Sequence, residues 1–269
     1  MPAAEDLALL IQAAEAAGDI ALKYSGPDAK RWDKPDDQGP VTEADLAVNA
    51  MLEDMLPQAR PNYGWLSEES EDSQERLGRD RVFIIDPIDG TRSFAEGSRT
   101  WAHSLAVAER GEVIAAVIYL PKRELLYSAA KGQGAFCNGQ PVSVTPPTEL
   151  PQTKVLTAKP NLDSKHWRGG SAPEFLRSYR PSLAYRLARV ADGGYGAMLT
   201  LRRSWEWDIA AGDLLLREAG GVTTDRHGTG LRFNNATPLL DGVLAAAPDV
   251  HQVLLAGLEP QGPGIPGRY

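Results

Sequence analysis

Cysteine is almost missing from this chain of 269 residues, where Cys137 is the only one. A lone cysteine cannot close an internal disulfide or build a cysteine-rich zinc site, so the sequence favours a reducing compartment. Basic residues are also scarce relative to acidic ones, with 28 Lys and Arg against 36 Asp and Glu and a formal net charge of -8. Such a chain lacks the overall basic surface that binding to a nucleic-acid polymer or an anionic membrane requires.

Long hydrophobic runs are missing as well. No stretch approaches the roughly 20 apolar residues of a membrane span, and the N-terminus shows no signal-peptide pattern, so we expect no membrane span and a cytoplasmic location. The phosphate loop, the His-Glu-x-x-His zinc motif, the Gly-x-Ser-x-Gly elbow and the dinucleotide fingerprint are absent too. These absences disfavour ATP use, serine-nucleophile hydrolysis and hydride transfer.

What is present is typical of a globular protein with mixed helices and strands. Apolar residues at helical spacing predict helices over residues 1–24, 43–56, 209–219 and 250–258. β-branched runs predict strands over residues 82–85, 155–158, 222–224 and 243–246, with further strand-like runs in 190–201 and an antiparallel meander over 102–144. The pattern indicates an α/β or α+β fold.

Prolines at positions 141, 146, 147 and 151 suggest a boundary between two lobes. We therefore expect an N-terminal α+β lobe over residues 1–147 and a C-terminal α/β lobe over 148–258. The remaining segment, 259–269, alternates glycine with proline and is expected to be a flexible tail.

The most informative motif is Asp86-Pro-Ile-Asp-Gly-Thr91, which follows a predicted buried strand. Because Pro87 cannot extend a strand's hydrogen-bond ladder, we expect the chain to turn there and bring Asp86 and Asp89 to one side. Two carboxylates and the Ile88 carbonyl are the hard oxygen ligands that Mg²⁺ selects. A tight turn with an Asp helix cap is the plainer interpretation, which the full six-residue string disfavours.

Three further acidic positions allow a structural interpretation beside the functional one. Asp45 fits a capping box with Thr42, the pair Glu68-Glu69 is typical of a solvated surface, and Asp208 stands where it can cap a helix. Individually these signals are weak. The four histidines lack ligand spacing and are expected to be structural or exposed: His103, His166, His227 and His251.

Taken together, the motifs resemble those of the inositol monophosphatase superfamily in order and spacing. The matching segments are Thr42-x-x-Asp45, Glu68-Glu69, Asp86-Pro-Ile-Asp-Gly-Thr91, Trp207-Asp-Ile-Ala-Ala-Gly212 and Glu218-Ala-Gly-Gly221. The resemblance covers residues 5–258 and implies a five-layered αβαβα sandwich, a homodimer and a lithium-sensitive, Mg²⁺-dependent phosphomonoesterase. It also implies two or three Mg²⁺ ions at each active site.

Carried onto this sequence, the resemblance assigns roles to individual residues. One Mg²⁺ is expected at Glu68, Asp86 and the Ile88 carbonyl, and a second at Asp86, Asp89 and Asp208. Asp45 and Thr91 are expected to activate the attacking water with help from Glu68 or Glu69. The residues expected to bind substrate are Asp89, Gly90, Thr91, Arg202, Arg203 and Asp208.

The substrate is less constrained by these motifs. The segment leading to Thr42 and the Glu206-Trp-Asp208 string are similar to 3'(2'),5'-bisphosphate nucleotidases of the CysQ type, and Arg202 and Arg203 suit a second phosphate. Adenosine 3',5'-bisphosphate is therefore the predicted substrate. Inositol 1-phosphate, a sugar phosphate and histidinol phosphate remain alternatives, as does an RNA- or transcription-associated binding role, which the acidic charge disfavours.

Overall fold

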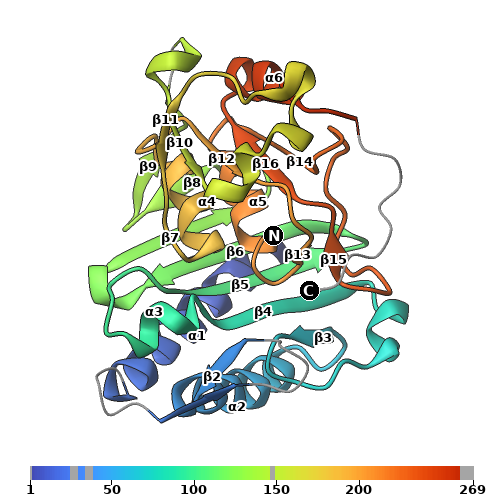
Figure 1. Ribbon diagram of the computed structural model, residues 1–269. Helices are drawn as coiled ribbons and strands as arrows, with labels where there is room; N and C mark the ends of the chain where they lie inside the picture. The colour runs from blue at the N-terminus through green and yellow to red at the C-terminus, as the bar shows by residue number, and fades with distance from the viewer. Residues whose placement is uncertain (1, 25–29, 34–38, 146–148, 261–269) are drawn as a thin grey trace.

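The computed structural model describes residues 2–24, 30–33, 39–145 and 149–260. Its elements stack in five layers (Figure 1), with two helices, a seven-stranded sheet, two helices, a five-stranded sheet and a last helix following one another. This is the αβαβα sandwich that the resemblance implied. Among the described residues, no helix combines the length and the apolar character that crossing a membrane needs.

The first layer consists of α1 (Pro2–Tyr24) and α2 (Glu43–Ala59). Their apolar faces pack on the first sheet, with Leu10 of α1 and Leu52 of α2 fully buried in one core cluster. The first helix was predicted with these bounds, whereas α2 runs one turn past the expected end at Leu56. Pro57 lies in the last turn of α2, where its missing N–H removes one helical hydrogen bond, that to the Glu53 carbonyl, and only two more helical residues follow.

The second layer is a sheet in the order β3-β4-β5-β6-β7-β8-β9. Strands β3 and β4 are parallel and all other neighbours are antiparallel, which confirms the predicted meander. The strands are β3 (Gly64–Ser67), β4 (Arg81–Asp89), β5 (Ala102–Glu109), β6 (Glu112–Leu120), β7 (Leu125–Ala130), β8 (Ala135–Cys137) and β9 (Gln140–Val142).

The prediction that the chain turns at Pro87 was wrong. Strand β4 continues to Asp89, and its pairing with β5 shifts register between Asp86 and Asp89. Asp86 lies opposite Ser104 and Asp89 opposite Ala102, so Pro87 and Ile88 together face one residue of β5. A β-bulge accommodates the missing proline N–H without ending the strand.

The middle layer contains α4 (Leu183–Ala191) and α5 (Ala210–Glu218), whose apolar side chains fill the core between the two sheets. Part of α4 overlaps the run 190–201, for which strand-like segments were expected. Ser182 caps α4 by accepting a hydrogen bond from the Tyr185 backbone N–H, and Leu183 and Leu187 then recur at helical spacing. The strand begins only at Ala197.

The second sheet has the order β11-β10-β12-β16-β14, and α6 (Pro248–Gly257) covers its outer face (Figure 1). Its strands are β10 (Lys154–Thr157), β11 (Leu176–Ser178), β12 (Ala197–Thr200), β14 (Val222–Thr224) and β16 (Val243–Ala246). Two small pairs complete the described strands, β1 (Arg31–Asp33) with β2 (Pro40–Thr42) and β13 (Ser204–Trp205) with β15 (Leu239–Leu240). A short helix, α3 (Thr91–Ala95), follows β4.

Two predictions fall mainly outside the described residues. The proposed lobe boundary lies within 146–148, and the expected tail lies in 261–269 apart from its first two residues.

Candidate active site

Three carboxylates from two distant segments meet in the space between the first sheet and the middle helices. Asp86 and Asp89 lie at the end of β4, and Asp208 lies just before α5. One oxygen atom from each carboxylate lies within 4.8 Å of the other two. Asp86 and Asp89 are buried and Asp208 is partly exposed, so the cluster has one open side. Three of the predicted metal ligands are thus brought together.

The bulge in β4 makes this convergence possible. Residues three apart in a regular strand point to opposite faces of the sheet. The extra residue between Asp86 and Asp89 removes that alternation, so both carboxylates reach the same cluster. Pro87, which was expected to end the strand, therefore lies in the bulge that brings Asp86 and Asp89 to the same cluster.

Asp89 is held by the start of α4. Its Oδ2 accepts hydrogen bonds from the Ser182 hydroxyl and from the Ala184 backbone N–H, each at 2.6 Å. Burial raises the pKa of Asp89 to about 6, although these two bonds favour the ionised form. The N-terminus of α4 thus fixes Asp89 in place and leaves its other oxygen to the cluster.

Asp45 has both the structural and the proposed functional contacts that the sequence suggested. It completes a capping box at the start of α2, where Oδ2 accepts from the Thr42 backbone N–H at 2.9 Å and from the Thr42 hydroxyl. Its Oδ1 lies 3.1 Å from Thr91 Oγ1, which also lies 3.0 Å from the Ile88 carbonyl oxygen. Since the Thr91 hydroxyl has one proton, it serves one of these acceptors at a time.

The electrostatics of the cluster favour a bound cation. Burial raises the pKa values of Asp86 and Asp208 well above the usual range, and neighbouring negative charges, including that of Glu68, raise them further. Burial also raises the pKa of Asp45 to about 6. Asp86 Oδ1 is buried with no hydrogen-bond partner among the described residues. An unpaired carboxylate oxygen within an acidic cluster suits a divalent metal ion.

Glu68 and Glu69 continue the chain directly from β3, and the Glu68 backbone N–H donates to the Ile85 carbonyl at 3.2 Å. Both side chains are partly buried. Of the two, Glu68 is the one whose charge acts on Asp45, Asp86, Asp89 and Asp208.

Gly90 lies between Asp89 and α3 and has a left-handed backbone with φ of 94°. A Cβ atom there would lie 3.3 Å from Ser182 Cβ, so a side chain would press on the residue that holds Asp89. Glycine is therefore required by both its conformation and its close approach to α4. Gly90 and Thr91, which were expected to bind substrate, lie at the start of α3.

The two arginines expected to bind substrate have different surroundings. Arg202 is exposed, and its positive charge acts on Asp208. Arg203 is partly exposed, and its Nε lies 3.3 Å from an Asp241 carboxylate oxygen. The charge of Arg202 therefore acts on the acidic cluster, whereas Arg203 pairs with a residue outside it.

A third arginine, Arg186 on α4, was not found by sequence reasoning. It is buried, its charges act on Asp89 and Arg202, and its guanidinium lies 4.6 Å from the Tyr179 ring centroid. No motif marks an isolated arginine within a helix. Ser182, in contrast, gives a helix-cap signal, because a serine directly before Leu-Ala-Tyr is a favourable N-cap.

Asp208 does not cap α5. The helix begins at Ala210, whose backbone N–H donates to the Glu206 carbonyl at 2.8 Å. Ser104 of β5 donates its hydroxyl proton to the Trp207 carbonyl at 2.8 Å, which ties the Asp208 segment to the first sheet. The Asp208 carboxylate is left to the acidic cluster.

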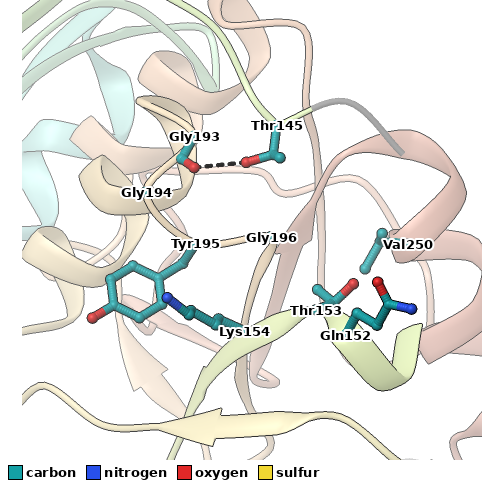
Figure 2. Close-up of a pocket in the computed structure, with 9 residues that line it drawn as sticks. All are labelled: Thr145, Gln152, Thr153, Lys154, Gly193, Gly194, Tyr195, Gly196 and Val250. Carbon is teal, nitrogen blue, oxygen red and sulfur yellow. Dashed lines mark hydrogen bonds between the residues drawn. The ribbon is translucent and has the colours of Figure 1, made fainter. Parts of the chain in front are cut away.

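A separate hollow lies beside the second sheet (Figure 2) and includes none of the predicted site residues. The Gly193–Gly196 turn beside it offers no free amide to an anion, because all four backbone N–H groups already donate, to Val190, Asp192, Arg189 and Lys154. The Thr145 hydroxyl in turn donates to the Gly193 carbonyl at 2.7 Å. The acidic cluster is the better candidate for catalysis.

Comparisons with known proteins agree with the fold. The sequence profile of the inositol monophosphatase family matches residues 3–261. An inositol-1-monophosphatase of Rhizobium meliloti is 35% identical over 201 residues, covering 71% of this chain and 73% of the relative. The Nus factor SuhB of Escherichia coli is 31% identical over 264 residues, covering 94% and 95%. The solved structure of an IMPase from Thermotoga maritima gives a TM-score of 0.80 at 27% identity, covering 94% and 96%.

Proposed function

Because this chain belongs to the inositol monophosphatase family, it is a phosphoric monoester hydrolase, and we propose that it cleaves a small phosphorylated metabolite with Mg²⁺ bound at the acidic cluster. The observation that carries the proposal is the convergence of Asp86, Asp89 and Asp208 within 4.8 Å. Their burial makes the uncompensated cluster costly, and a metal ion offsets that cost.

The metal ligands proposed for this chain follow from that cluster. Glu68, Asp86 and the Ile88 carbonyl would hold one Mg²⁺, and Asp86, Asp89 and Asp208 a second. When bound, such a pair lowers the pKa of an attacking water and offsets charge on the leaving oxygen. A third Mg²⁺ would bind in addition to these two ions.

Asp45 and Thr91 are proposed to receive the proton of the attacking water. The Thr91 hydroxyl lies between Asp45 Oδ1 and the Ile88 carbonyl. When the Ile88 carbonyl has another partner, the Thr91 hydroxyl donates its proton to Asp45. A lone pair of the Thr91 oxygen can then accept a hydrogen bond from the attacking water. A pKa of about 6 suits Asp45 to accept a proton near neutral pH. Glu68 or Glu69 assists, and the Gly90 and Thr91 amides hold the phosphate.

For the substrate, we propose adenosine 3',5'-bisphosphate, hydrolysed to AMP and phosphate. Arg186 and Arg202 place two positive charges beside Asp89 and Asp208. Two guanidinium groups repel each other, and an anion beside them relieves that repulsion. Guanidinium groups can make paired, charge-assisted hydrogen bonds to phosphate. Arg186 already donates from Nε to the Arg180 carbonyl and from Nη2 to the Pro181 carbonyl, so Arg202 has the freer donors. A second phosphate on the substrate supplies that anion. Arg203 contributes if its pairing with Asp241 opens.

The test compares phosphate release from adenosine 3',5'-bisphosphate and inositol 1-phosphate with Mg²⁺. We expect the bisphosphate to be preferred, and Arg202→Ala to reduce its kcat/KM about tenfold or more while changing that of inositol 1-phosphate little. Arg110→Ala is the matched control, because Arg110 is exposed in the turn at the opposite end of β5 and pairs with Asp80. A kcat/KM ratio of about ten or more in favour of inositol 1-phosphate would exclude the nucleotidase proposal.

Inositol 1-phosphate is the second candidate because a relative 35% identical to this chain is named inositol-1-monophosphatase. Against it, residues 199–204 contain no acidic side chain to bind an inositol hydroxyl. Sugar and histidinol phosphates belong to the same assay panel. Millimolar lithium is expected to inhibit the preferred reaction, and the active enzyme is proposed to be a cytoplasmic homodimer.

A binding role in transcription is a candidate of a different class, since the Escherichia coli relative is named Nus factor SuhB. The net charge of -8 disfavours RNA as a direct partner. Recovery of a stable RNA or polymerase complex with a variant that has lost phosphatase activity would support this second role.

A further inference from the structure

His103 lies on β5 at the position that faces the bulge of β4. Its neighbours Ser104 and Ala102 pair with Asp86 and Asp89, so His103 stands opposite Pro87 and Ile88. The side chain is completely buried, and its Nδ1 is hydrogen bonded to the Pro87 carbonyl oxygen. The His103 side chain therefore makes a hydrogen bond to the Pro87 carbonyl of the kind that a backbone N–H makes between regular strands.

The bond fixes the tautomer of the imidazole. A carbonyl oxygen only accepts, so the proton lies on Nδ1 and the neutral ring has a bare Nε2. Nε2 is buried and has no hydrogen-bond partner among the residues that the structure describes. The hydrogen bond of Nδ1 therefore accounts for the histidine at this position.

His103 supplies a donor to this carbonyl. The bulge disrupts the regular ladder at Pro87, and a buried carbonyl left without a partner is costly. The ring of His103 is held between two aromatic rings, with centroid distances of 5.4 Å to Trp101 and 6.3 Å to Tyr119. A donor fixed in this way restrains the carbonyl and, through it, the two peptide units between Asp86 and Asp89.

We propose that His103 is a positioning residue of the metal site, which holds the β4 bulge in the shape that presents Asp86, the Ile88 carbonyl and Asp89 to the proposed pair of metal ions. The inference rests on the proposed metal-dependent function. His103 itself touches neither substrate nor metal, and it acts through the Pro87 carbonyl alone.

Two variants that replace the ring with an amide distinguish the effect of moving the hydrogen-bond donor from the effect of losing the ring. In His103→Asn, the amide nitrogen takes the place of Nδ1, whereas in His103→Gln it reaches the place of Nε2. Calorimetric titration of the metal-free proteins with Mn²⁺ measures the effect. We expect His103→Asn to bind within about threefold of the wild type and His103→Gln about tenfold or more weakly. The Mg²⁺ concentration for half-maximal activity should shift in the same order, with kcat largely restored at saturating Mg²⁺.

His251→Gln is the matched control. His251 is buried on α6, and its Nε2 lies 2.9 Å from Thr224 Oγ1, beside the second sheet. The Gln amide nitrogen reaches the place of Nε2 and can keep the contact with Thr224, so this variant should retain wild-type Mn²⁺ affinity. Equal Mn²⁺ affinity in wild type and His103→Gln, or equal weakening in the Asn and Gln variants, would overturn the inference. Failure of the wild type to bind Mn²⁺ would instead contradict the proposed metal site.

A measurement on the wild type keeps the test independent of variant folding. In NMR spectra of the ¹⁵N-histidine-labelled protein, the Nδ1–H resonance of His103 should be protected from exchange and should shift on Mg²⁺ addition. An unprotonated Nδ1, or a resonance unchanged by saturating Mg²⁺, would overturn the inference.

Discussion

At the scale of single residues, Asp89 joins the two halves of the chain. Its backbone ends β4, its Oδ2 is bound by Ser182 and Ala184 of the second half, and its carboxylate lies in the acidic cluster. The same side chain therefore assembles the site and supplies a proposed metal ligand. Its removal affects both the closure of the cluster and its charge.

Asp89→Asn tests this double role. The amide keeps an oxygen that can accept from Ser182 but loses the charge, so we expect kcat/KM to fall by more than about a hundredfold, because even partners outside the coordination shell contribute 10–100-fold. Phosphate release at saturating Mg²⁺ measures the effect. Asp249→Asn, at an exposed position in the first turn of α6, should retain wild-type activity. Activity retained in Asp89→Asn would show that the metal site has been misplaced.

At the scale of elements, the site depends on how the segment before α5 is anchored. Glu206 is fully buried, and its carboxylate accepts from the backbone N–H groups of Asn234 and Asn235 at 2.6 and 2.9 Å. The neighbouring buried Arg76, between β3 and β4, donates to Asn234 Oδ1 at 2.6 Å and to the Asn235 carbonyl at 3.0 Å. This buried network links three segments, of which one carries Asp208.

Glu206→Ala should therefore destabilise the fold by about 3 kcal/mol, since it leaves buried N–H groups without their charged acceptor. Chemical denaturation measures the free energy of unfolding. Glu218→Ala is the matched control, because Glu218 also accepts from two backbone N–H groups, those of Gly132 and Gly134, but in a more exposed place. We expect its cost to stay below about 1 kcal/mol. Equal costs for the two variants would argue against a special role of the buried network.

At the scale of the whole molecule, the acidic cluster links stability to pH and metal. Folding raises the pKa values of Asp45 and Asp89 from the ordinary aspartate value of 3.8 to about 6. The folded state then binds more protons than the unfolded state between about pH 4 and 6, so these two groups stabilise the fold at low pH and lose that contribution as pH rises to 6. Burial lowers the pKa of His103 to about 4, which acts in the opposite direction over about pH 4 to 6.5.

The increase in melting temperature caused by Mg²⁺ reports on the carboxylates that bind the ion, separately from other titrating groups. Protons compete with the metal for the same oxygens, so this increase should be largest above pH 6 and should shrink as pH falls towards 4. Thermal unfolding with Mg²⁺ and with a chelator, at pH 5 and pH 7.5, measures it. An increase that is equal at both pH values would mean that the ion binds away from the cluster of Asp86, Asp89 and Asp208.

Much of the architecture could be predicted from local patterns. Apolar spacing located α1, α2, α5 and α6, and β-branched runs located the core of β4 and most of the meander. These signals succeed because each element buries one continuous face. Helix α4 was missed because its short apolar stripe sits beside a strand-like run, and only packing between the two sheets distinguishes them.

The sequence by itself determined which residues have the chemistry. The resemblance of the acidic motifs to those of the inositol monophosphatase superfamily implied a metal-dependent phosphatase. The single cysteine and the excess of acidic residues disfavoured disulfide and nucleic-acid chemistry. Tertiary structure decided what those residues contact. The β4 bulge aligns Asp86 with Asp89, the start of α4 grips Asp89, and Arg202 and Arg203 separate into different environments. The hydrogen bonds of Ser182 to Asp89 and of His103 to the Pro87 carbonyl join residues far apart in the chain, and such contacts leave no local pattern in the sequence.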